Sequence, residues 1–164
     1  MNINKKYENF DNLVKIINTL REIKKDQIIA YCHGCYDFLH IGHIKHLQES
    51  KNFSNEYTTL IVTITPDIFI NKGLYRPIFN ETLRAEAIAS LECVDYVAVN
   101  KWPTAVEAIK LLKPNLFIKG VEYQHHKTQA LIDEETAIQS IGGKLVFAGN
   151  MIFSTTELLR RLRG

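Results

Sequence analysis

The stretch QIIAYCHGCYDFLHIGHIKHL, residues 27–47, decides the fold. Its first six residues form a short, almost continuously apolar run, which predicts a buried strand over residues 27–32. A glycine-containing polar segment follows and leads directly into a predicted helix over residues 42–51. A buried strand that runs into a helix through a short connection is the basic unit of an α/β protein.

The same alternation continues on both sides of this stretch. Apolar residues recur at helical spacing over residues 10–23. Further strands are predicted at residues 58–65, 96–99, 116–119 and 144–148, and further helices at 81–92, 104–112, 134–141 and from 154 onward. Most of these strands are continuously apolar, as in a parallel sheet covered on both faces. The sequence therefore predicts a doubly wound, Rossmann-like α/β fold in one domain of residues 1–164, with a helix within residues 1–26 packed on the sheet.

Composition narrows the classes of function. The net charge is only +2, so a broad nucleic-acid-binding surface is not expected. No apolar run approaches the roughly 20 residues of a membrane span, and the start MNINKKYENF has no apolar stretch suited to a signal peptide. We therefore expect a cytoplasmic protein that binds neither nucleic acid nor membrane, and whose three cysteines are reduced thiols.

The candidate chemistry lies between the first strand and its helix, because ligands of doubly wound sheets bind at the carboxyl ends of strands. Gly34 permits close approach of the backbone to a ligand, and His40, Gly42 and His43 lie at or just before the helix N-terminus. Two imidazoles, free backbone N–H groups and the helix dipole together suit a polyphosphate. Asp37 could position an imidazole or a bound metal complex, and the sequence leaves both roles open.

Other interpretations of this segment compete with the polyphosphate site. Cys32 and Cys35 with His40 and His43 have the composition of a zinc site, although such sites usually lie in small loop-rich modules. The C-x-x-C pair could be redox-active, although such a pair normally opens a helix directly. The cysteines could also be small core residues and the histidines incidental. We favour the polyphosphate site, with Cys32 and Cys93 in the core.

A family resemblance rests on several motifs. GCYDFLHIGH, residues 34–43, matches the G-x-[FY]-D-x-x-H-x-G-H signature of the cytidylyltransferase-like nucleotidyltransferase superfamily. Within it the chain most resembles the adenylyltransferase domain of the bifunctional heptose-phosphate kinase/adenylyltransferase. The matching stretches, which span about residues 8–162, are HGCYDFLHIGH, NKGLYRPIFNETLRAEAIASLECVDYV, PNLFIKGVEY and FSTTELL. Glycerol-3-phosphate cytidylyltransferase is similar only in the first and last motifs.

The resemblance implies an enzyme that transfers a nucleoside monophosphate, AMP from ATP, to a sugar phosphate such as heptose 1-phosphate and releases pyrophosphate. The alternative is a CTP-dependent transfer to a polyol phosphate such as glycerol 3-phosphate. The glycerol-phosphate enzymes carry an arginine shortly before the last motif, whereas AGNMIF has no basic residue here, which favours the first activity. Mg²⁺ is the implied cofactor, held mainly by phosphate oxygens with no metal site built from side chains. The resemblance also implies a homodimer, and a separate sugar kinase upstream because no kinase domain is present.

The resemblance further implies roles for individual residues. The catalytic set is His40, His43, Lys72 and Arg84, whose side chains are expected in a solvent-filled cleft, and Arg76 is a weaker candidate. The segment at residues 154–157 is expected to form a second helix N-terminus that binds phosphate. Its sequence also matches a capping box, and one helix end can have both roles. The implied nucleotide-binding residues are Gly34, Cys35, Tyr36, Asp37, His40, Gly42, His43, Lys119, Gly120, Ser154, Thr155 and Thr156.

Overall fold

A computed structural model describes residues 6–54, 57–125 and 127–149. The strands are β1 (Ile28–Gly34), β2 (Thr58–Ile64), β3 (Tyr96–Val99), β4 (Leu116–Gly120) and β5 (Lys144–Ala148). The helices are α1 (Phe10–Ile23), α2 (Ile41–Lys51), α3 (Glu81–Ala89), α4 (Val106–Leu112) and α5 (Gln129–Ser140), with short 3₁₀ helices η2 (Asp67–Phe69) and η3 (Val121–Tyr123). The helix expected from residue 154 lies outside the described residues.

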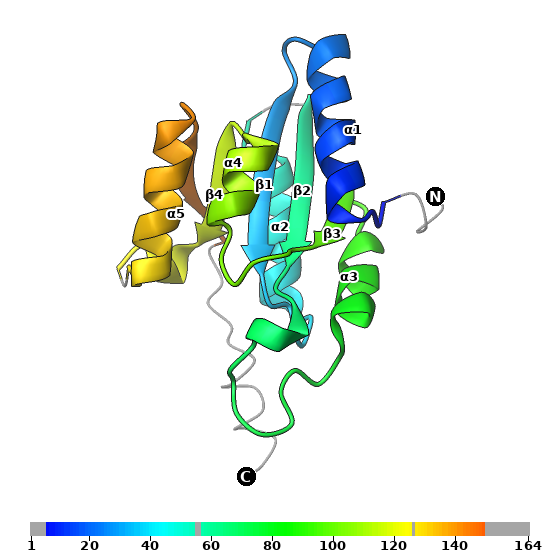
Figure 1. Cartoon of the computed structure of the whole chain (residues 1–164), viewed down its shortest axis with the longest axis vertical. Helices are drawn as coiled ribbons and strands as arrows, with labels where there is room; N and C mark the ends of the chain where they lie inside the picture. Colours follow the sequence, from blue (N-terminus) through cyan, green and yellow to red (C-terminus); the bar gives the residue numbers. More distant parts are fainter. Residues whose placement is uncertain (1–5, 55–56, 126, 150–164) are drawn as a thin grey trace.

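The five strands form one parallel sheet in the order β3-β2-β1-β4-β5. The chain winds outward from β1 to β3 and then returns to the other side of β1 to form β4 and β5. The strand order therefore reverses between β1 and β4, where a doubly wound sheet opens a crevice at its carboxyl edge. The prediction of a doubly wound, Rossmann-like parallel sheet is confirmed (Figure 1).

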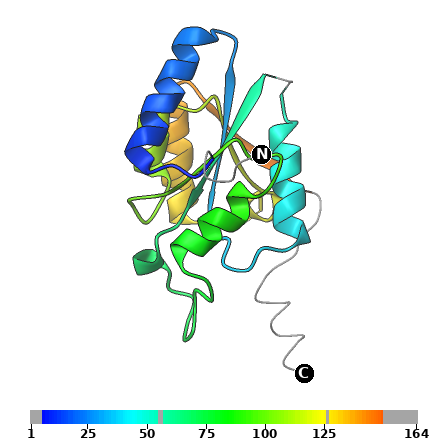
Figure 2. The same ribbon diagram turned by 90° about the vertical axis from the view of Figure 1, so that its right-hand side faces the viewer.

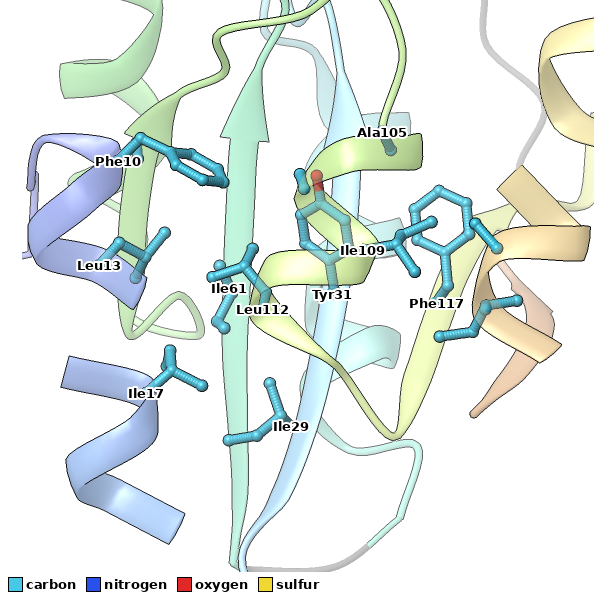
Figure 3. Packing of buried hydrophobic residues seen from close by; sticks show 14 residues of the cluster. Phe10, Leu13, Ile17, Ile29, Tyr31, Ile61, Ala105, Ile109, Leu112 and Phe117 are labelled. Atoms are coloured by element: carbon cyan, nitrogen blue, oxygen red, sulfur yellow. The ribbon is translucent and has the colours of Figure 1, made fainter. Parts of the chain in front are cut away.

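Helices cover both faces of the sheet, with α1 and α5 on one side and α2 on the other (Figure 2). On the first face, apolar residues of α1, α4 and α5 pack against Tyr31 and Phe117 of the central strands (Figure 3). On the second face, Leu47 of α2 and Ile88 of α3 pack against strand residues such as Val62. The continuously apolar strands are explained by this burial on both faces.

Short polar side chains start three of the helices. Asn9, Asn80 and Thr128 each accept a hydrogen bond from the backbone N–H three residues further on, which satisfies a donor that the helix itself leaves free. The cap at Thr128 explains why α5 begins at Gln129, five residues before the predicted start. Among the described residues, none of the helices has the length and apolar character that a membrane crossing requires.

Helix α1 is tied to α4 as well as packed on the sheet. The Arg21 guanidinium donates to the carbonyl oxygens of Leu112 and Lys113 at 2.6 Å and 2.5 Å. These carbonyls belong to the C-terminal end of α4, where backbone acceptors lack partners within the helix and where a cation is favourable. The expected N-terminal helix is therefore an integral layer of the fold.

Candidate active site

The two motif histidines lie at the start of α2 with their rings stacked. His40 is the N-cap, and its Nδ1 accepts a hydrogen bond from Gly42 N at 3.2 Å. The ring centroids of His40 and His43 are 3.8 Å apart, and Tyr36 contacts the His43 ring edge-to-face at 5.2 Å. Nδ1 of His43 is buried. The helix start therefore holds both imidazoles in a fixed arrangement at its positive end.

Burial keeps both imidazoles neutral. It lowers the pKa of His40, and it lowers the pKa of His43 to about 3, with smaller contributions from the repulsion that a proton on His40 or His46, or the Lys72 ammonium, would exert. A bound polyphosphate would act in the opposite direction, because negative charge favours the protonated imidazole. Neutral rings that face an anion can accept protons when that anion binds.

A single pocket at the carboxyl ends of β1, β4 and β5 brings together most of the predicted site. Arg84 does not line it, and residues 154–156 lie outside the described part of the chain. The predicted residues that line it are Gly34, Cys35, Tyr36, Asp37, His40, Gly42, His43, Lys72, Lys119 and Gly120. The pocket therefore lies beside the crevice that the strand order predicts.

The two pocket lysines have different environments. Lys72 is exposed, and its ammonium makes no hydrogen bond or ion pair with any described residue. Lys119 instead pairs with Glu134 at 3.2 Å, with both side chains largely buried, and lies 4.9 Å from the Tyr123 ring centroid. Glu134 also accepts a hydrogen bond from Ala105 N at 3.0 Å. The charge of Lys119 is thus largely neutralised, whereas that of Lys72 is available to a ligand.

Asp37 lines the pocket and contacts the loop before α3. Its buried carboxylate accepts hydrogen bonds from Arg76 Nε and from the backbone N–H groups of Ile78 and Phe79. Both oxygens are therefore used to fix the loop before α3 against the start of the motif. Arg76, the weaker candidate for phosphate binding, is held in this ion pair.

Arg84 is not in the cleft, in contrast to the expectation from the sequence. The residue is 1% exposed, and its guanidinium donates to the carbonyl oxygens of Cys35, Thr65 and Phe79. It also pairs with Asp67 at 2.5 Å. The sequence placed Arg84 correctly at the start of a helix beside the site, but position in the sequence does not reveal which acceptors surround a side chain. These contacts join the ends of β1 and β2 to the loop before α3.

The pocket also contains residues that the sequence analysis did not select. His33 bonds Thr63 through Nδ1 at 2.8 Å, and burial lowers its pKa to about 3. His46 follows His43 by three residues, a helical spacing that could have indicated it. Glu122 and Tyr123 lie two and three residues after Gly120, near the carboxyl end of a strand, which is the signal that selected Lys119 and Gly120.

The cysteines do not support the zinc or redox interpretations. Cys32 is buried, its thiol contacts Ser50 Oγ at 3.5 Å, and burial raises its pKa to about 12. A thiol that resists deprotonation is a poor metal ligand and a poor nucleophile. Within residues 6–54, 57–125 and 127–149, no group of three or more potential ligands is arranged to hold a metal ion. The expectation of Cys32 in the core is confirmed.

Replacement of Arg84 tests its structural role. Arg84→Met leaves several carbonyl oxygens without their donor, so we expect the free energy of unfolding to fall by about 3 kcal/mol. Lys72→Met, at an exposed position, should leave it nearly unchanged. Urea denaturation of both variants measures the difference. A stable Arg84→Met protein with weakened nucleotide binding would instead support the phosphate role expected from the sequence.

Two half-buried histidines should make stability depend on pH. In the folded protein the pKa values of His33 and His43 lie near 3, below the 6.5 of an ordinary histidine. The unfolded chain therefore binds more protons between pH 6.5 and 3, and stability falls as the pH falls, by about 1.4 kcal/mol per pH unit for each group. Urea denaturation at pH 7, 6 and 5 should show this slope. His33→Asn should reduce it, whereas replacing the exposed His125 should not; equal slopes in both variants would contradict the assignment.

Comparison with known proteins agrees with the motif. A family model described as Cytidylyltransferase-like matches residues 31–160. The Bifunctional protein HldE of Aliarcobacter butzleri (strain RM4018) is 33% identical over 99% of this chain and 32% of its own length. The protein of the same name from Helicobacter pylori (strain G27) is 40% identical over 68% of this chain and 23% of its own length. The chain thus spans about a third or less of these relatives.

A solved structure supports the same conclusion. The lipopolysaccharide core biosynthesis protein from Thermoplasma volcanium GSS1 is 26% identical, with a TM-score of 0.62 over 76% of this chain and 98% of that one. The resemblance found in the sequence is confirmed, and with it the general class, a nucleotidyltransferase. The chain belongs to the cytidylyltransferase-like family.

Proposed function

We propose that the chain transfers AMP from ATP to a sugar phosphate such as heptose 1-phosphate and releases pyrophosphate. The observation that carries the proposal is the pair of stacked, neutral imidazoles at the N-terminus of α2, which line a pocket at the carboxyl edge of the sheet. The similarity to HldE proteins and to a lipopolysaccharide core biosynthesis protein supports a sugar phosphate as the acceptor.

The proposed chemistry is an in-line displacement. An oxygen of the acceptor phosphate attacks the α-phosphorus, a new P–O bond forms, and the bond between the α-phosphorus and the bridging oxygen breaks as pyrophosphate leaves. Negative charge grows on the leaving oxygen and on the non-bridging oxygens. His40 and His43 are fixed at the helix start, so their N–H groups can donate to these oxygens without rearrangement. No covalent intermediate with the protein is required.

Mg²⁺ is the proposed cofactor, and the residues of the pocket fit it. Mg²⁺ is usually held by substrate phosphates together with one or two carboxylates. Of the two carboxylates that line the pocket, Asp37 is occupied by the loop before α3, whereas Glu122 makes no hydrogen bond with any described residue. Glu122 and the phosphate oxygens would therefore hold the ion, which when bound neutralises charge on the triphosphate.

The choice of substrates is tested by a direct comparison. Pyrophosphate release is measured with ATP and with CTP, each in the presence of heptose 1-phosphate or glycerol 3-phosphate. We expect the highest kcat/KM for ATP with heptose 1-phosphate. A preference for CTP with glycerol 3-phosphate would establish the alternative cytidylyltransferase activity, and NTP binding without pyrophosphate release for any acceptor would indicate a nucleotide sensor.

Substitution of the two motif histidines tests the proposed mechanism. His40→Ala and His43→Ala should each lower kcat by a factor on the order of 10² to 10³, as loss of one oxyanion donor does. The KM for the nucleotide should change much less, because the lost bonds strengthen in the transition state. Lys72→Ala should mainly raise KM, and Lys45→Ala, an exposed position on α2, serves as the control. Near-normal turnover of either folded histidine variant would remove the basis of the proposal.

The proposed reaction has consequences for partners and location. Its acceptor is a phosphate ester, so a kinase or an equivalent enzyme must supply it, and an enzyme that consumes ATP is expected in the cytoplasm. We also propose a homodimer and a single domain over residues 1–164. The exposed apolar side chains of Ile68, Leu74 and Tyr75, which are 83%, 88% and 90% exposed, support a self-association surface.

Light scattering tests the proposed dimer. The measured mass at micromolar concentration should be about twice the 18.9 kDa of one chain. Replacing Leu74 and Tyr75 by serine should shift the mass toward that of the monomer, because apolar contact area is lost. A wild-type mass equal to that of a single chain would contradict the dimer without affecting the proposed chemistry.

A further inference from the structure

One peptide unit in the pocket wall is held at both ends by α2. Ala148 ends β5 and Gly149 follows it, and both residues line the pocket. His46 Nδ1 donates to the Ala148 carbonyl oxygen at 3.1 Å, and the Gly149 N–H donates to Glu49 Oε2 at 2.7 Å. The carbonyl and the N–H belong to the same planar peptide unit and point in opposite directions. Two bonds at its two ends therefore fix the rotation of the peptide plane.

The glycine in this unit has a backbone conformation that favours glycine, and it lies against α2. Gly149 has a φ of +97°, a conformation that L side chains rarely adopt. A Cβ added there would lie 3.4 Å from His46 Cβ and 3.6 Å from His46 Cα. The backbone that leaves β5 thus packs directly on the helix at the residue that holds its carbonyl oxygen.

The helix that holds this peptide is itself anchored to the sheet. The Ser50 hydroxyl donates to the His46 carbonyl oxygen at 2.7 Å, and the thiol of Cys32 in β1 contacts the same hydroxyl at 3.5 Å. Ser50 is fully buried. The body of α2 therefore cannot shift without disturbing the core, and its first turn carries the imidazoles of His40 and His43.

We propose that His46 and Glu49 are positioning residues for nucleotide binding. They align the Ala148–Gly149 wall of the pocket with the imidazoles at the start of the same helix. The inference rests on the proposed binding of a nucleoside triphosphate in this pocket.

Paired substitutions separate positioning from direct contact with the ligand. The side-chain amide nitrogen of asparagine can occupy the place of histidine Nδ1, whereas that of glutamine occupies the place of Nε2. His46→Asn therefore keeps the donor to Ala148, and His46→Gln and His46→Leu remove it. Glu49→Gln keeps an acceptor for Gly149, and Glu49→Leu removes it. Gln48→Leu, at an exposed position between them, is the control for a leucine on this helix.

The readout is the Kd measured by titration calorimetry with Mg·ATP or Mg·CTP, whichever the wild-type protein binds more tightly. His46→Leu, His46→Gln and Glu49→Leu should each raise Kd about 3- to 10-fold, as expected for loss of one hydrogen bond. His46→Asn, Glu49→Gln and Gln48→Leu should stay within about twofold of the wild type. Wild-type affinity in the folded leucine variants, or rescue by glutamine in place of asparagine at position 46, would overturn the proposal.

A glycine pair gives an independent test. Gly149→Ala should raise Kd to a similar extent, because alanine is strained at a φ of +97° and its relaxation displaces the held peptide. Gly142 also has a positive φ, +78°, but nothing lies within 4 Å of an added Cβ, so Gly142→Ala should cost stability without changing Kd. Equal Kd values for the two alanine variants would contradict the proposal, even if a leucine variant failed to fold. If the wild-type protein bound neither nucleotide, the proposed function itself would fail.

Discussion

The arrangement of the site depends on one buried guanidinium. Arg84 reaches from α3 to carbonyl oxygens at the carboxyl ends of β1 and β2, to the loop before its own helix, and to the Asp67 carboxylate. Backbone acceptors at strand ends would otherwise need water, which would loosen the segments they belong to. A planar group with five donors can join more such segments at once than an ammonium, which has three. Arg84 therefore holds the start of the motif segment and the loop that carries Lys72 in a fixed relative position.

The electrostatic character of the pocket follows from what its charged groups already contact. Lys119 is neutralised by Glu134, both motif imidazoles are neutral, and Asp37 is used by the loop before α3. Among the described residues that line the pocket, Lys72 is the basic side chain whose charge remains available. A triphosphate carries far more negative charge than this lysine offsets. Helix N–H groups and a divalent cation that travels with the nucleotide are thus needed to balance the remainder.

The sequence was sufficient for the fold, and it named most of the described residues that line the pocket. Continuously apolar strands alternate with helices. Each strand or helix can be recognised from the apolar residues of its own segment, without knowledge of the rest of the chain. Lys119 and Arg84 show where such reasoning ends. Both were expected to face phosphate, yet each meets an acidic partner, Glu134 or Asp67, from a separate segment of the chain. Only the packing of α5 against β4, or of α3 against η2, brings those charges together, so no local pattern could have indicated it.

The core begins earlier in the chain than the family match does. The match begins at Tyr31, but β1 begins three residues earlier, and α1 contributes Phe10, Leu13 and Ile17 to the first face of the sheet. A fragment cut at the start of the match would begin inside the central strand and would leave an apolar face of the sheet without its cover. The start of the family match is thus not the start of a fragment that can fold, because such a fragment must include every segment that buries apolar surface in the core.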